Sequence, residues 1–162
     1  MSPSRRSILA AGGAGLVAQP MAAQATPDAN ADVAFLTKLS KDSNAALMRG
    51  DAVRYVELLQ MTDDFTLMTP FGGPPTRGAT LTRERILEIG RFFRNGTFEM
   101  ELVQAYASPD LVVLALIERT NCEVGGLPAQ DWALRVTLVY RPEARQWRLA
   151  HRHADPLVAG IR

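Results

Sequence analysis

The feature that most constrains the fold is a change of pattern at Asn95-Gly96. Before this point apolar residues recur at helical spacing. After it, apolar and β-branched residues dominate four stretches that are separated by turn-forming residues. Strands so close in sequence pair as hairpins, so an antiparallel sheet is expected over residues 97–155. The predicted strands cover 97–106, 111–124, 131–140 and 147–155.

Two helices are predicted at the start of the domain. The first runs from about Asp32 to Arg49, because apolar residues recur at helical spacing and Gly50 supplies a C-terminal stop. Asp51 is suited to cap a second, shorter helix that ends near Leu59.

A strand over 65–69 follows, and then a loop over 71–75 with two Gly and two Pro, which neither a helix nor a strand accommodates. A third helix is predicted from Thr80 or Thr82 through Phe93, ended by Asn95-Gly96. Three helices followed by hairpin-linked strands predict an α+β domain. The expected architecture is an antiparallel sheet with the three N-terminal helices packed on one face.

The composition excludes several classes of protein. The 162 residues include 18 Lys and Arg and 17 Asp and Glu, for a formal net charge of +1, so no basic surface for nucleic acid is expected. Cys122 is the only cysteine, which excludes a disulfide within the chain and a zinc site built from cysteines. A chain of this length corresponds to one domain.

Residues 1–25 have the pattern of an export signal. Arg5 and Arg6 precede a short apolar run over 8–18, and Ala23-Gln24-Ala25 fits a cleavage site. The run is too short for a permanent membrane span, and the paired arginines resemble a twin-arginine signal. We therefore expect a mature chain that begins at Thr26 and is periplasmic or secreted.

Alternation along the last predicted strand suggests a pocket. Trp147 and Leu149 belong in the core, so His151, His153 and Asp155 are expected on the same face. Both imidazoles are therefore expected to project into one cavity with Trp132. Trp132 itself is either a core residue or part of the wall of that pocket.

Three interpretations of the two histidines remain open at this point. They are structural side chains bonded to buried groups, polar or acid/base groups in a small-molecule pocket, or metal ligands with Asp155 as a third. Glu118 and Arg119 are adjacent on a strand, so one of them faces the interior and needs a partner there. Arg119 and Thr69 complete the candidate pocket residues.

Four parts of the sequence form a recognisable pattern together with the order of the predicted elements: residues 46–51, 63–73, Arg77-Gly78 and 147–156. This pattern resembles the nuclear transport factor two-like superfamily, in particular its SnoaL-like and ketosteroid-isomerase-homologue branch, over residues 31–158. The resemblance implies a cone-shaped, curved antiparallel sheet with the three N-terminal helices packed on its concave face and an apolar pocket. It also implies no metal or cofactor, a small apolar or amphipathic ligand, and a homodimer formed through the outer sheet face.

Two departures from the steroid isomerases argue against their reaction. Thr69 stands where the isomerases have a general-base Asp, and Ser43, within Asp42-Ser43-Asn44, stands where they have an oxyanion-donating Tyr. The resulting expectation is an exported small-molecule-binding protein or cofactor-free enzyme of unspecified reaction. The alternative is a non-catalytic, dimeric interaction module of the same fold.

Overall fold

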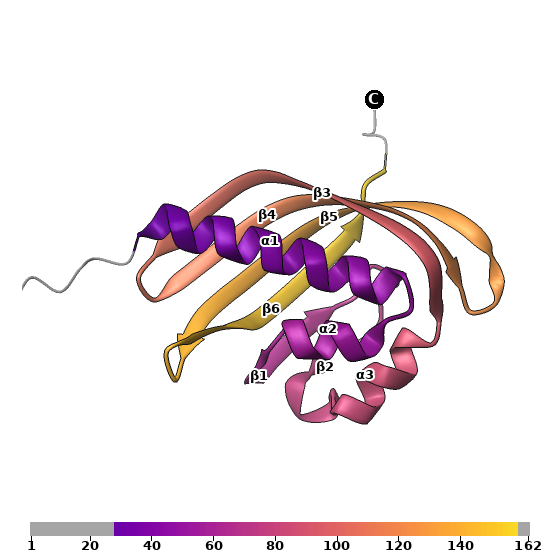
Figure 1. Ribbon diagram of the computed structural model, residues 1–162, viewed down its shortest axis with the longest axis horizontal. Coiled ribbons are helices and arrows are strands. Elements are labelled where there is room, and N and C mark those ends of the chain that lie inside the picture. The colour runs from indigo at the N-terminus through magenta and orange to yellow at the C-terminus, as the bar shows by residue number, and fades with distance from the viewer. Residues whose placement is uncertain (1–27, 159–162) are drawn as a thin grey trace, which may run out of the picture.

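The computed structural model describes residues 28–158, so the predicted signal peptide lies outside the described residues. These described residues form three α-helices, a short 3-10 helix and six strands, arranged as in Figure 1. Within residues 28–158, no helix has the length and apolar character needed to cross a membrane. The elements in chain order are α1 (Ala29–Met48), α2 (Ala52–Leu58), β1 (Met61–Met68), β2 (Thr76–Arg77), η1 (Gly78–Thr80), α3 (Arg83–Gly90), β3 (Phe93–Ser108), β4 (Leu111–Val124), β5 (Leu127–Glu143) and β6 (Gln146–Pro156).

The strands form one curved sheet in the order β2-β1-β6-β5-β4-β3. Strands β3 to β6 are antiparallel neighbours, which confirms the predicted hairpins. The sheet is mixed rather than wholly antiparallel, because β1 pairs with β6 in parallel. From β1 the chain passes through a helix-containing segment to β3 and then through three hairpins. This path brings the last strand, β6, back beside β1. The predicted α+β class is confirmed.

The boundary between the first two helices follows the predicted signals. The backbone N–H of Gly50 donates to Leu47 O and that of Asp51 donates to Ala46 O, the pattern of a Schellman C-cap. Gly50 has a φ of 91°, and a Cβ there would lie 2.8 Å from Phe93 O. The Asp51 carboxylate then accepts from Arg54 N at 2.9 Å and caps α2.

The third helix is shorter than predicted. It is capped by Thr82 and ends at Gly90, and Phe93 already belongs to β3. Asn95, with a φ of 54°, and Gly96 form an irregularity within β3 instead of a helix stop. A Cβ on Gly96 would lie 2.5 Å from Met48 O, so close packing of β3 on the end of α1 requires glycine here.

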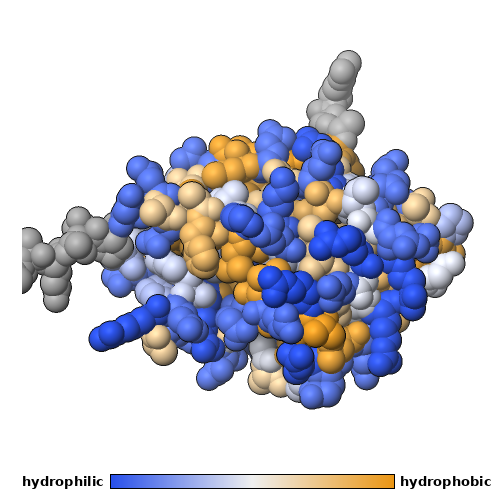
Figure 2. Space-filling view, in the orientation of Figure 1, coloured by the Kyte–Doolittle hydropathy of each residue, from blue (hydrophilic) through white to orange (hydrophobic). Residues whose placement is uncertain are grey.

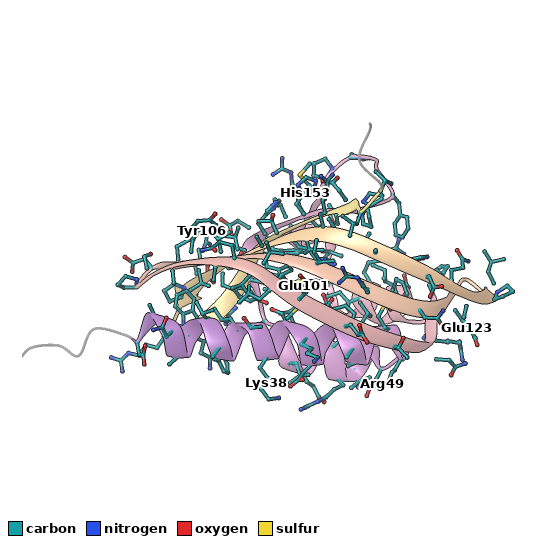
Figure 3. The ribbon with its side chains drawn as sticks, turned by 90° about the horizontal axis from the view of Figure 1, so that it is seen from above. Lys38, Arg49, Glu101, Tyr106, Glu123 and His153 are labelled. Atoms are coloured by element: carbon teal, nitrogen blue, oxygen red, sulfur yellow. The ribbon has the colours of Figure 1, made fainter. Side chains whose placement is uncertain are left out.

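The core lies between the helices and one face of the sheet, which we call the inner face. The buried residues Leu114, Leu116, Val136 and Leu138 define this face, and Leu36 of α1 is packed with them. None of the helices described within residues 28–158 lies on the opposite, outer face: Figure 3 shows His153 and Tyr106 on the side of the sheet away from α1. On the side that bears the helices, apolar residues appear only as patches among hydrophilic ones (Figure 2).

Candidate functional site

A cavity of about 520 Å³ lies between the inner face of the sheet and the segment from α1 to α3. A volume of this size suits a small organic molecule. Its walls are mainly aliphatic and aromatic, and every strand of the sheet contributes to them. The apolar lining residues are Leu47, Met48, Met61, Phe65, Leu67, Pro70, Phe71, Leu81, Ile86, Ile89, Phe93, Phe98, Trp132 and Leu134.

The buried charged groups of the cavity wall are Glu118 of β4 and Arg152 of β6, which form an ion pair. Arg152 donates from Nη1 and Nη2 to the two carboxylate oxygens of Glu118, at 2.8 and 2.7 Å. The Glu118 side chain is only 5% exposed and the Arg152 side chain 16% exposed. Burial alone would lower the pKa of the Arg152 guanidinium, but the charge and hydrogen bonds of Glu118 raise it above its usual value. The pair therefore places two compensating charges in an otherwise apolar wall.

Two tyrosines lie near this ion pair. Tyr55 of α2 lines the cavity, and burial raises the pKa of its hydroxyl to about 12, while Arg152 and Glu118 act on it in opposite directions. Burial also raises the pKa of Tyr140, whose hydroxyl is hydrogen-bonded to Ser40 Oγ at 2.8 Å. Both phenols are therefore neutral at physiological pH. The Tyr140 hydroxyl already has a hydrogen-bonding partner, Ser40.

Three aromatic side chains of the cavity wall pack against one another, and one of them reaches the surface. Phe71 lines it yet is 71% exposed, and its ring meets Trp132 edge-on at a centroid distance of 5.4 Å. The ring of Phe93 also meets this indole edge-on, with 6.4 Å between the ring centroids. Thr69 also lines the cavity, with its hydroxyl donating to Gly72 O. The structure therefore brings together two of the residues predicted from the sequence, Thr69 and Trp132.

The placement predicted for the histidines is wrong, because β6 contains a bulge. Tyr140 pairs with Leu149 while the adjacent Val139 pairs with His151, so Ala150 is an extra residue in the strand. An extra residue exchanges the faces of all side chains beyond it. Leu149 points inward as predicted, but beyond the bulge it is Arg152 that lines the cavity, and His151 and His153 face outward.

The other candidates from the sequence also lie outside the cavity. His151 Nδ1 is hydrogen-bonded to Thr66 Oγ1 at 2.6 Å, and His153 Nε2 lies 3.4 Å from Asp155 Oδ1. Arg119 donates to Glu101 at 3.0 Å, and its side chain is 48% exposed. Of the adjacent charges Glu118 and Arg119, the interior one is thus Glu118. Neither Asp155 nor Arg119 is a cavity residue.

These outward groups do not assemble a metal site. Among residues 28–158, no group of three or more His, Cys, Asp or Glu side chains is placed to hold an ion. The two imidazole rings are 6.4 Å apart between centroids and tilted by 54°. Metal ligation by His151, His153 and Asp155 therefore has no support in the geometry.

Sequence reasoning missed Tyr55, Arg152 and Asn44 as cavity residues. If His151 and His153 face inward, alternation puts Arg152 on the solvent side. No residue near it in the sequence indicates the bulge that reverses this assignment. Glu118 had a usable signal, since it continues the inward series of Leu114 and Leu116 along β4. That series was ambiguous because the alternate residues of β4 are apolar as well.

Residues 36–159 match the SnoaL-like domain family. The chain belongs to that family. No curated protein sequence matches this SnoaL-like protein.

Solved structures share the fold of the SnoaL-like chain at low sequence identity. A provisionally assigned dehydratase of the NTF2-like family from Streptomyces avermitilis is 19% identical, with a TM-score of 0.65, and the match covers 80% of this chain and 99% of that one. A provisionally assigned scytalone dehydratase from Novosphingobium aromaticivorans is 13% identical, with a TM-score of 0.63 and coverage of 83% and 93%. A provisionally assigned calcium/calmodulin-dependent protein kinase II association domain from Thiobacillus denitrificans is 19% identical, with a TM-score of 0.58 and coverage of 74% and 93%. The shared fold thus spans proteins named as dehydratases and as association domains, so the fold alone does not fix the function.

Proposed function

We propose that this SnoaL-like protein binds a small, mostly apolar molecule in its cavity, as a binding protein or a cofactor-free enzyme. The observation that carries the proposal is the cavity itself: about 520 Å³, apolar walls, and the buried Glu118–Arg152 pair in the wall. Apolar pockets with a few placed polar groups are typical small-molecule sites. The likeness to two structures named as dehydratases is consistent with a reaction in this cavity.

Blocking the cavity tests this proposal. Leu134 of β5 lines the cavity, so Leu134→Trp would place an indole in the space that a ligand needs. Its neighbour Arg135 points to the other side, with 62% of its side chain exposed, so Arg135→Trp is a matched control that adds the same group outside.

Native mass spectrometry of protein purified from its own host would detect the bound molecule. We expect a small-molecule adduct on the wild type and on Arg135→Trp, and its loss from Leu134→Trp with the far-ultraviolet circular dichroism unchanged. An adduct retained by Leu134→Trp would place the binding elsewhere and contradict the proposal.

We also propose that the protein is exported by the twin-arginine route and acts in the periplasm. The support is the sequence of residues 1–25, with Arg5, Arg6 and the Ala23-Gln24-Ala25 cleavage pattern. N-terminal sequencing of the periplasmic protein should begin at Thr26. Replacement of both Arg5 and Arg6 by Lys should retain the precursor in the cytoplasm, and unimpaired export of that variant would refute the assignment.

A second candidate function, assembly, has its own support. In the described part of the chain no helix covers the outer sheet face, and the strand register places small and apolar residues at the centre of that face. The structures named as association domains share this fold. We propose a homodimer packed through the outer face. Its central residues are Val113, Ala115, Thr137 and Val139.

Analytical ultracentrifugation tests the homodimer. Ala115→Arg would place a charge at the centre of the outer face and should give a monomer. Ala34→Arg, on the exposed side of α1, is the control and should leave the dimer intact. A wild type that sediments as a monomer at micromolar concentration would refute this second proposal and leave the first untouched.

A further inference from the structure

We infer that the cavity selects a molecule whose polar group is uncharged and both donates and accepts hydrogen bonds, a hydroxyl above all. Tyr55, Glu118 and Arg152 are the residues that make this selection. The inference rests on the proposed ligand-binding function, which it deepens by naming the class of ligand.

The first step is the charge balance of the cavity. Glu118 and Arg152 cancel each other through two hydrogen bonds of 2.8 and 2.7 Å. The third charged lining residue, Arg85, is 61% exposed and is paired with Glu88 at the surface. The buried wall therefore has no net charge for an ionic ligand to neutralise.

The second step is the cost of an ionic ligand. A carboxylate that approached Arg152 would also approach the Glu118 carboxylate, and an ammonium that approached Glu118 would also approach the Arg152 guanidinium. Either ion would lose its hydration in an apolar cavity without an unpaired counter-charge. Both kinds of ion are therefore excluded more strongly than an uncharged group.

The third step is the hydrogen-bonding capacity that the pair leaves unused. A guanidinium has five N–H donors and a carboxylate about four acceptor positions. Across residues 28–158, the only side-chain hydrogen bonds of Arg152 and Glu118 are the two that join them. The Tyr55 hydroxyl likewise has no hydrogen-bonding partner in this part of the chain, although the phenol lines the same cavity. Donors and acceptors thus lie side by side, which is the pattern that a hydroxyl group complements.

Four probes with one apolar body separate the possible ligand classes. The body is adamantane, which does not absorb where tryptophan is excited, and the substituents are a hydroxyl, a chlorine, a carboxylate and an ammonium. Quenching or enhancement of Trp132 fluorescence reports binding, and Trp132→Phe identifies the part of the signal that comes from the cavity rather than from Trp147.

We expect 1-adamantanol to bind about tenfold more tightly than 1-chloroadamantane, the gain from a buried hydrogen-bonded group, and more tightly still than either ion. Equal affinity for the alcohol and the chloride, or tighter binding of an ion, would overturn the inference while leaving ligand binding in place. If none of the four probes binds, the proposed function fails and the inference fails with it.

A double variant assigns the selection to the ion pair. Glu118→Leu with Arg152→Met removes both charges together and avoids an unpaired buried charge, so the fold should survive. The preference for the alcohol over the chloride should fall from about tenfold to about twofold or less, with Tyr55 left as the polar group. An unchanged preference in this variant would show that Glu118 and Arg152 do not make the selection.

Discussion

Removing one partner of the Glu118–Arg152 pair should destabilise the fold far more than removing both. Arg152→Met leaves a carboxylate that is 5% exposed without its two hydrogen bonds. An unpaired buried charge of this kind costs about 3–5 kcal/mol, which is roughly 10–15 °C in Tm for a domain of this size. Glu118→Leu alone should cost a similar amount.

The double variant Glu118→Leu with Arg152→Met should lie within about 1 kcal/mol of the wild type, because buried ion pairs are often replaced by apolar residues without loss. Urea unfolding of the wild type, both single variants and the double variant, followed by circular dichroism, gives the coupling free energy. The surface pair Arg119–Glu101, with side chains 48% and 61% exposed, is the control and should couple by less than about 1 kcal/mol. Single-variant costs below about 1 kcal/mol, or costs that simply add in the double variant, would refute the view that this pair is desolvated.

Three further outcomes are expected from the same structure. Gly90→Ala should cost about 1–3 kcal/mol because its Cβ would lie 2.2 Å from Ala52 Cβ, and adding Ala52→Gly should recover part of that loss in urea unfolding; no recovery would contradict the packing argument. His151→Ala and His153→Ala should each change the affinity for 1-adamantanol less than twofold, since neither imidazole lines the cavity, and a large loss in calorimetric titration would reverse this placement. Tyr55 has a folded pKa of about 12 against 10.0 for an exposed tyrosine, so the unfolded chain ionises first and stability falls as pH rises above 10. Tyr55→Phe should remove about 1.4 kcal/mol of the loss measured between pH 8 and pH 11, and an unchanged loss would show that this phenol is solvated.

Local signals in the sequence were enough to predict most of the architecture. Gly50 and Asp51 end one helix and start the next by backbone and side-chain hydrogen bonds that depend on few neighbours. The hairpins of β3 to β6 followed from turn residues between strands. The parallel pairing of β1 with β6 had no such signal, because it joins residues about 85 positions apart and is decided by how the whole domain closes.

The candidate site could be predicted only in part, and the reason is the same in two strands. Alternation assigns faces correctly until a strand gains an extra residue, and β6 gains one at Ala150. Strand β3 is irregular between Leu102 and Gln104, and beyond that point Tyr106 is 63% exposed, although unbroken alternation would put it on the same face as Phe98, which lines the cavity. Thr69 and Trp132 lie on the cavity because no such shift separates them from the residues that define their face.

The bulge at Ala150 makes the chemistry of the cavity sensitive to chain length rather than to residue identity. Insertion of one residue directly after Ala150, with the bulge and the pairing of Tyr140 with Leu149 retained, would turn Arg152 outward and bring His151 and His153 to the inner face. An ion-paired, uncharged lining would give way to two titratable imidazoles while Glu118 stayed in place. In a lineage of such proteins, insertions and deletions of one residue in β6 would therefore diversify the reaction or ligand in a single step, where point substitutions would need several.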